Sequence, residues 1–189
     1  MPFGRAKKKS VLLDESGLYD YAVKTLGRRM RTVAELKRLM RSRVEKGEHG
    51  EAKIERVISR LKAQRYLNDT NYAKSYTRLR QENNSFGKRR VRQDLVQKGV
   101  HADVIAKTLD AAYEEVNDEE LARKHLERKR VRKPTNEKEA ARVMRMLVRA
   151  GFSMGVIFRI LKKWEVDEDA LAGLEFMDND GPESSNGDQ

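Results

Sequence analysis

The fold is decided by a stretch that reads LVQKGVHADVIAKTL at residues 95–109 and returns, offset by 52 residues, as LVRAGFSMGVIFRIL at residues 147–161. The two copies share an apolar set around one glycine, while the polar positions between them differ. The identical pairs are Leu95/Leu147, Val96/Val148, Gly99/Gly151, Val104/Val156, Ile105/Ile157 and Leu109/Leu161. We expect these positions to be buried between two helices or to form the corner that joins them.

A third copy of this hairpin lies upstream with a longer corner. The apolar residues of 33–44 predict one helix, EKGEHGEA at 45–52 predicts a loop, and the apolar residues of 54–61 predict the next helix. A further short helix is expected before each hairpin, around the shared pairs Tyr21-Ala22, Tyr72-Ala73 and Leu121-Ala122. The pattern predicts an all-α protein of three tandem three-helix repeats, forming an elongated, curved molecule with flexible tails.

The repeats predict the domain boundaries. The expected segments are a basic N-terminal tail at 1–16, repeat 1 at 17–67, repeat 2 at 68–116, repeat 3 at 117–165 and an acidic, disordered tail at 166–189.

Several residues have side chains suited to helix ends. Thr32 followed by Glu35 is a capping box, and Asn136 followed by Glu139 resembles one. The corner glycines suit the left-handed backbone that ends a helix. Further candidate N-caps are Asp69, Asp118 and Ser153.

Positive charge is concentrated in the body of the chain. The net charge of the whole sequence is +11, but residues 1–164 carry all 41 Lys and Arg residues against 21 of the 30 Asp and Glu residues, a net of +20. A body this cationic repels itself and is typical of proteins that bind a polyanion, such as nucleic acid or an acidic protein surface. Residues 165–189 carry nine acids and no base. One hypothesis is that this segment folds back on a basic face and competes with DNA.

Nothing in the sequence calls for catalysis, a cofactor or a metal. No phosphate-binding glycine loop occurs, and the serines lack a nearby histidine that could act as a base. The absence of cysteine excludes disulfides and thiolate chemistry and fits a reducing cytoplasm. No apolar run approaches the ~20 residues of a membrane span. The histidines lie in different repeats without metal-ligand spacing and are expected on the surface: His49, His101 and His125.

The candidate binding residues are clusters of Lys and Arg that recur near the end of the first helix and the start of the second. Arginine dominates most clusters, and its planar fork can hold two phosphate or carboxylate oxygens. The clusters are Arg28, Arg29 and Arg31; Arg38, Arg41 and Arg43; Arg78 and Arg80; Lys88, Arg89, Arg90 and Arg92; and Arg128, Lys129, Arg130, Arg132 and Lys133.

Stacking of exposed aromatic rings on bases is not expected to dominate binding. Most tyrosines fall on apolar stripes and are expected in the core, as is Trp164. The tyrosines are Tyr19, Tyr21, Tyr66, Tyr72, Tyr76 and Tyr113.

Three blocks of the sequence resemble consecutive segments of the RecX family of bacterial recombination regulators. They are LGRRMRTVAELKRLM at 26–40, IERVISRLKAQRYLNDTNYAKSYTRLR at 54–80 and GKRRVRQDLVQKGV at 87–100. The matching features are the basic run before Glu35-Leu36, the corner at Tyr66-Leu67-Asn68-Asp69, and Gly87 followed by a basic helix that ends at Lys98-Gly99. The resemblance covers roughly residues 18–164. The basic start and the acidic tail are not family features.

The resemblance implies three tandem three-helix repeats and a function as a regulator of the RecA recombinase. It implies binding to RecA and its nucleoprotein filament, inhibition of ATP hydrolysis, strand exchange and coprotease activity, and some affinity for single- and double-stranded DNA without sequence preference. Such a regulator acts in DNA repair, recombination and the SOS response, in the cytoplasm, and we expect it to be a monomer. The residues themselves leave two alternatives open: a general DNA-binding architectural protein, and a helical scaffold whose charge only keeps it in solution.

Overall fold

The computed structural model describes residues 12–164, and its regular structure over that range is entirely helical. The acidic tail predicted for 166–189 and the first eleven residues of the predicted basic tail lie outside this range. A short 3₁₀ turn, Arg41–Arg43, follows the second helix. The α-helices are α1 Glu15–Arg28, α2 Val33–Met40, α3 Glu48–Ala63, α4 Asp69–Asn84, α5 Lys88–Gln97, α6 Ala102–Tyr113, α7 Asp118–Arg128, α8 Glu137–Arg149 and α9 Met154–Lys163.

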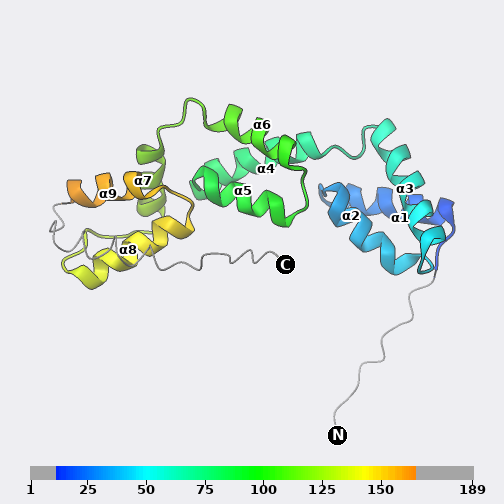
Figure 1. Cartoon of the computed structure of the whole chain (residues 1–189), viewed down its shortest axis with the longest axis horizontal. Coiled ribbons are helices and arrows are strands. Elements are labelled where there is room, and N and C mark those ends of the chain that lie inside the picture. The colour runs from blue at the N-terminus through cyan, green and yellow to red at the C-terminus, as the bar shows by residue number, and fades with distance from the viewer. Residues whose placement is uncertain (1–11, 165–189) are drawn as a thin grey trace, which may run out of the picture. The chain divides into compact units, whose positions relative to one another are not determined.

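These helices form three consecutive groups of three, α1–α3, α4–α6 and α7–α9, which we call repeats 1, 2 and 3 (Figure 1). The predicted all-α architecture of three-helix repeats is confirmed. The compact units follow a different division. The first unit contains the residues up to Arg78 together with Arg92–Ala112, and the second contains Leu79–Val91 together with the residues from Tyr113 on. The division therefore passes through α4 and α5.

The core of repeat 1 lies among its three helices. Leu18 and Ala22 of α1 pack with Leu36 and Met40 of α2, and all four are fully buried. The predicted apolar stripe of α3 completes this core, through Ile54, Val57, Ile58 and Leu61. Each such side chain stabilises the fold by about 1.5–3 kcal/mol relative to exposure to water, so the core lets a cationic sequence fold.

The core of repeat 3 is built in the same way. Ala122 and Leu126 of α7 pack against a large apolar face of α8 and against α9, whose Ile157 and Leu161 are fully buried. Phe86 and Val131 pack on the edge of this cluster. The alanine shared by the centres of the three first helices is fully buried in every copy: Ala22, Ala73 and Ala122.

Both predicted corner glycines have left-handed backbones, with φ 73° at Gly99 and 91° at Gly151. They are also the points at which neighbouring repeats meet. The Thr32 hydroxyl, at the start of α2, donates to the Lys98 carbonyl at 2.6 Å, and a Cβ on Gly99 would lie only 2.4 Å from the Cβ of Ala34. The second helix of repeat 1 thus begins against the glycine corner of repeat 2.

The same joint recurs between repeats 2 and 3. The Gly87 N–H, just before α5, donates to the Ala150 carbonyl at 2.8 Å. A Cβ on Gly151 would lie 2.3 Å from the Arg90 nitrogen. Lys98 and Ala150 are 52 residues apart, the offset of the sequence repeat, so the same carbonyl accepts in both joints. We call this contact, between a second helix's first turn and the next repeat's glycine corner, the repeat joint.

The helix caps agree with the prediction at some ends and differ at others. The Thr32–Glu35 capping box is present. Asp69 and Asp118 were expected as N-caps, but these predictions are wrong: the capping side chains belong to the preceding residues, Asn68 and Asn117. The Asp69 carboxylate is used elsewhere, accepting from the Val33 N–H at 2.9 Å and so tying α4 to α2.

Ser153 precedes α9 as expected but makes no side-chain cap hydrogen bond. The loop expected at 45–52 is shorter than predicted, because α3 begins at Glu48. The first turn of α3 contains Glu48 and Glu51, whose negative charges are stabilised by the positive end of the helix dipole.

Some burial predictions are also wrong. Val96 and Val148, expected to be buried, are 60% and 38% exposed, because each lies on the outer side of its helix beside a buried leucine. Tyr66 is 57% exposed in the turn after α3. His125, expected on the surface, is only 3% exposed and packs between Phe86 and Phe152.

Candidate nucleic-acid interface

Some candidate cations are engaged within the protein. In the first unit, the Arg41 guanidinium donates twice to the Glu51 carboxylate, at 2.8 and 3.2 Å. This pairing raises the pKa of Arg41 and lowers the pKa of Glu51. The Arg43 guanidinium lies 5.0 Å from the ring centre of Tyr21. Both side chains therefore hold the 3₁₀ turn in place, and a ligand would have to compete with these contacts.

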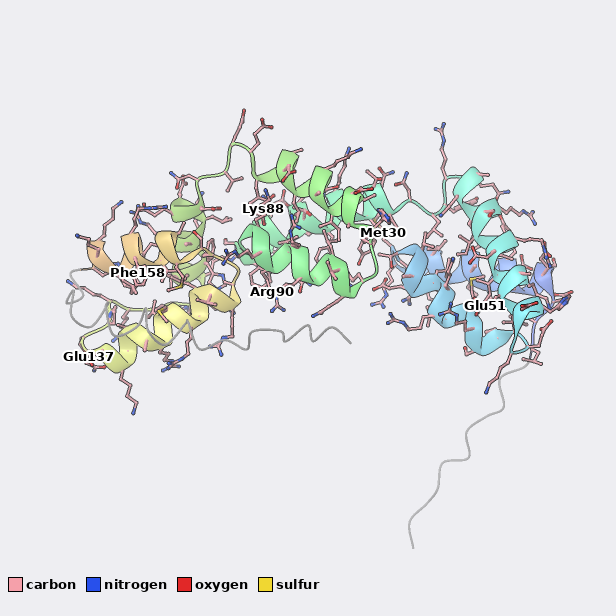
Figure 2. All side chains as sticks on the ribbon, viewed as in Figure 1. Met30, Glu51, Lys88, Arg90, Glu137 and Phe158 are labelled. Carbon is pink, nitrogen blue, oxygen red and sulfur yellow. The ribbon has the colours of Figure 1, made fainter. Side chains whose placement is uncertain are left out.

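In the second unit, candidate arginines fix the end of α4. Arg80 donates to the Asn84 side chain at 3.1 Å, and Arg128 donates to the Glu82 carbonyl at 2.9 Å. Arg90 lies over the Phe86 ring, 5.7 Å from its centre, at the repeat joint. Figure 2 shows Arg90 with Lys88 at the start of α5. An arginine can bind a phosphate, a carbonyl oxygen or an aromatic ring with the same guanidinium group. The sequence pattern alone therefore does not show which of these partners a given arginine contacts.

Other candidates extend into solvent with no hydrogen bond or ion pair to another residue in 12–164. Their charges are available to an outside ligand, and each could contact a phosphate or carboxylate oxygen. Three further candidates differ from this group: Arg31 is half-buried, and Lys88, half-buried, and Arg78, exposed, each make a contact within the protein. The solvent-exposed group is Arg28, Arg29, Arg38, Arg89, Arg92, Lys129, Arg130 and Arg132.

The densest group of exposed cations lies in the segment between α7 and α8. The chain leaves α7 through Arg130, which has a left-handed backbone with φ 52°. The Val131 N–H then donates to the Leu126 carbonyl at 3.0 Å, which turns the segment back on the repeat core. This turn directs the long basic side chains outward while Val131 and Pro134 face the protein.

This segment and one face of α8 enclose a hollow of about 300 Å³, which we call the basic hollow. Its cations are Lys129, Arg130, Arg132 and Lys133 from the segment and Arg142 from α8. Its apolar floor consists of Val131, Pro134, Val143 and Met146.

Among the described residues, Glu139 is the one acid that lines the basic hollow. Its carboxylate already accepts from the Thr135 N–H at 2.8 Å and from the Thr135 hydroxyl at 3.0 Å. The bonds to Thr135 lower the pKa of Glu139, so it stays ionised as part of the helix cap. Five cations therefore face one carboxylate that is bound to the backbone, and the basic hollow favours an anionic ligand.

Lys98 is an engaged cation that the sequence analysis did not single out. Its ammonium lies 3.1 Å from the Glu35 carboxylate and 5.3 Å from the ring centre of Tyr76. Burial works against the charge, but hydrogen bonds to Tyr72 and Glu35 outweigh it and raise the pKa of Lys98. The Thr32–Glu35 capping box is the sequence feature that could have pointed to Lys98, because Glu35 both caps α2 and pairs with Lys98 at the repeat joint.

In residues 12–164, no group of three or more His, Asp or Glu side chains could hold a metal ion. Over the same range, every helix is too short or too polar to cross a lipid bilayer.

Comparison with known proteins identifies the family. A regulatory protein RecX from Leptothrix cholodnii is 35% identical over 118 residues, which cover 62% of this chain and 73% of the relative. A regulatory protein RecX from Myxococcus xanthus is 32% identical over 171 residues, covering 83% of this chain and 90% of the relative. The chain belongs to the RecX family. The second three-helix domain of RecX matches residues 68–109, and the third matches residues 117–161.

Solved RecX structures have the same fold. A crystal structure of a regulatory protein RecX superposes with a TM-score of 0.64 at 27% identity, covering 79% of this chain and 71% of that one. The structure of RecX from Lactobacillus salivarius has a TM-score of 0.63 at 23% identity, with 80% and 96% coverage. Some relatives are longer: the RecX match from Bacillus velezensis, 31% identical, covers 87% of this chain but 61% of the relative.

Proposed function

We propose that this RecX-family chain binds RecA and its nucleoprotein filament and inhibits ATP hydrolysis, strand exchange and coprotease activity. It does so without catalysis, in the cytoplasm, as part of DNA repair, recombination and the SOS response. The observation that supports this role is the set of exposed cations, available in both compact units, on a body of net charge +20. Family membership supports a regulatory role for such a surface.

The physical basis of the proposal is multivalent contact with a repeating anionic track. A protein–DNA filament presents phosphates and protein carboxylates at regular intervals. Individually weak contacts from consecutive repeats add through effective concentration, so a bound regulator dissociates slowly and hinders protomer addition or turnover. Surface arginines suit this role because they pair with either kind of oxygen.

The test is RecA ATP hydrolysis on single-stranded DNA, measured while the chain is titrated from far below one molecule per protomer. We expect turnover to fall at substoichiometric ratios, since one bound regulator affects many protomers of a filament. Inhibition that begins only as the DNA becomes saturated would instead support the alternative, a general DNA-binding architectural protein, which the same positive charge also favours.

A matched pair of variants separates specific contact from charge. Arg89→Ala with Arg92→Ala removes two exposed candidate cations of α5. Arg56→Ala with Arg123→Ala removes the same charge from two surface arginines paired to Glu15 and Glu119. We expect the first variant to need several-fold more protein for half-inhibition and the second to match the unmodified chain. Equal losses would mean that only net charge matters.

A further inference from the structure

The basic hollow lies where repeat 3 has an open repeat joint. Glu139 is the third residue of α8, as Glu35 is the third residue of α2 and Arg90 the third residue of α5. Glu35 and Arg90 both contact the next repeat's glycine corner. Glu139 and Arg142 line the basic hollow instead. The same helix face is therefore buried in repeat 2 and available to a ligand in repeat 3.

The lining sets the chemistry of the ligand. The rim provides five cations, and the floor is apolar, so a ligand that satisfies both carries carboxylates or phosphates beside apolar groups. Within residues 12–164, no aromatic side chain lines the basic hollow. Single-stranded nucleic acid draws much of its affinity from stacking on such rings, so phosphates alone would leave the floor unused.

The chain contains a segment with this complementary composition. Residues 165–189 carry nine acids and no base. Within them, Asp167, Glu168 and Asp169 come before the apolar Leu171, Leu174, Phe176 and Met177, and Asp178 and Asp180 follow. We call residues 167–180 the acidic–apolar segment.

The acidic–apolar segment begins close enough to reach. Trp164, at the end of α9, packs on the core cluster that Val131 also contacts. Figure 1 shows the end of α9 and the start of α8, where Figure 2 labels Glu137, at the same end of the second unit. The fourteen residues from Trp164 to Asp178 can span up to ~46 Å, whereas α8 with its 13 residues is only ~20 Å long.

Another repeat corner is a poorer occupant. The corner docked at the joint of repeat 1 presents Lys98, which pairs with Glu35 at 3.1 Å. In repeat 3 the corresponding glutamate, Glu139, is held by Thr135, and five cations surround the opening. A basic corner from a second copy would meet like charge there.

We propose that the basic hollow binds the acidic–apolar segment of the same chain and that this contact excludes polyanions from the hollow. The cations of the hollow's rim pair with the carboxylates of the acidic–apolar segment, and the leucines and Phe176 of that segment cover the apolar floor. Exclusion of DNA or filament rests on the proposed function, whereas binding of the segment does not. The device would lower non-specific DNA binding until a stronger polyanionic track displaces the segment.

The binding test uses a segment-neutralised chain, the full chain in which all six acids of the acidic–apolar segment are replaced by their amides: Asp167, Glu168, Asp169, Glu175, Asp178 and Asp180. A labelled peptide of residues 165–180 with the natural sequence is added in trans and followed by fluorescence anisotropy. We expect saturable binding that weakens at least fivefold between 50 and 200 mM salt, because added salt screens the attraction between the peptide's carboxylates and the cations of the hollow. A peptide with Leu174→Ser and Phe176→Ser should bind at least fivefold more weakly, because it leaves the floor uncovered.

Charge reversal locates the site. In the same background, Arg130→Glu with Arg132→Glu should weaken peptide binding at least tenfold. Arg28→Glu with Arg29→Glu makes the same change in net charge in the first unit and should leave binding within twofold. Arg132→Glu with Arg142→Glu provides a second reversal, and circular dichroism verifies that each variant is folded. Equal losses in the hollow and control variants, or no peptide binding, would overturn the proposal.

The regulatory consequence is tested with an oligo-dT strand at low salt. Neutralising the acidic–apolar segment should tighten DNA binding several-fold in the unmodified body but by less than twofold when Arg130 and Arg132 are reversed. The same gain in both backgrounds would mean that the acids act only through net charge. Peptide binding at the hollow together with no effect on RecA would reject the proposed function and leave this inference standing.

Discussion

Arg130 joins an exposed, long cationic side chain to a left-handed backbone, with φ 52°. Residues with a Cβ adopt this conformation at a cost of about 1–2 kcal/mol, which glycine avoids. Gly99 and Gly151 occupy the corresponding position after their own helices, where the next residue's N–H likewise donates to a leucine carbonyl. An arginine at this position therefore places charge at the hollow's rim at the expense of local stability.

Replacing Arg130 by glycine should separate these two effects. We expect Arg130→Gly to raise the free energy of unfolding by up to about 1 kcal/mol, since relief of strain exceeds the added freedom of the unfolded chain. Binding of oligo-dT to the segment-neutralised chain should weaken about two- to threefold. Urea denaturation and anisotropy measure the two quantities, with Arg130→Ala as the control that loses the charge but keeps the strain. A fall in stability would contradict this account of the turn.

His125 is a buried base inside the second unit. Its Nδ1–H donates to the Asn84 carbonyl at 2.8 Å, which fixes the neutral tautomer. Burial lowers the pKa of His125, and the charges of Lys129 and Arg128 lower it further. Because the folded pKa lies below the ordinary 6.5, the unfolded chain binds the proton first as the pH falls.

The contribution of His125 to the free energy of unfolding should therefore be fully present above about pH 6.5. It should decline as the pH drops below that value, by at most about 1.4 kcal/mol per pH unit. His125→Gln keeps a donor for Asn84 but cannot titrate, so its stability should change less between pH 7 and pH 5. Urea denaturation at both values measures the difference. The same slope in both proteins would assign the acid sensitivity to another residue.

At the scale of helices, the repeat joint explains why the sequence copies share their glycines. Left-handed geometry alone would permit asparagine, but at Gly99 and Gly151 a neighbouring helix also lies within 2.4 Å of the missing Cβ. Gly27, by contrast, lies inside α1 without a positive φ, and beyond its own helix backbone no atom comes within 4 Å of the position that a Cβ would take. Alanine should therefore have opposite effects at the two kinds of site.

We expect Gly99→Ala and Gly151→Ala each to lower the free energy of unfolding by about 2–4 kcal/mol, from strained backbone and overpacking together. Gly27→Ala should raise it by about 0.5–1 kcal/mol, because alanine favours helix. Chemical denaturation followed by circular dichroism tests both. A neutral Gly99→Ala would mean that α2 shifts away from the corner at little cost, and the joint would not be a rigid contact.

Helix pattern and corner glycines could be predicted because they leave a local, periodic trace in the sequence. The joint itself could not, because it depends on which residues meet across repeats: Thr32 and Lys98 are 66 positions apart. The capping errors at Asp69 and Asp118 have a similar origin, since neighbouring Asn and Asp compete for one cap and tertiary contacts choose between them. Likewise, the pattern of arginines does not reveal which guanidinium lies over a ring and which faces water.

For the whole molecule, charge predicts how binding responds to salt. Each phosphate contact releases condensed counterions, so affinity falls steeply as salt rises. Arg89→Ala with Arg92→Ala should flatten the slope of log affinity against log salt by about 1 per lost contact, equally for unrelated DNA sequences. Arg56→Ala with Arg123→Ala is the control of equal charge. An unchanged slope would place the DNA contacts on other cations, and a loss confined to one sequence would indicate base readout.

The repeat joint also bears on how this chain can be divided. Since α5 begins against a corner that belongs to repeat 3, a protein cut after Tyr113 would uncover Phe86 and the first turn of α5. The boundaries of the sequence repeats therefore do not coincide with the boundaries of the segments that pack together. A chimera between relatives should exchange segments that run from one repeat joint to the next, so that each second helix keeps the glycine corner of its own parent protein.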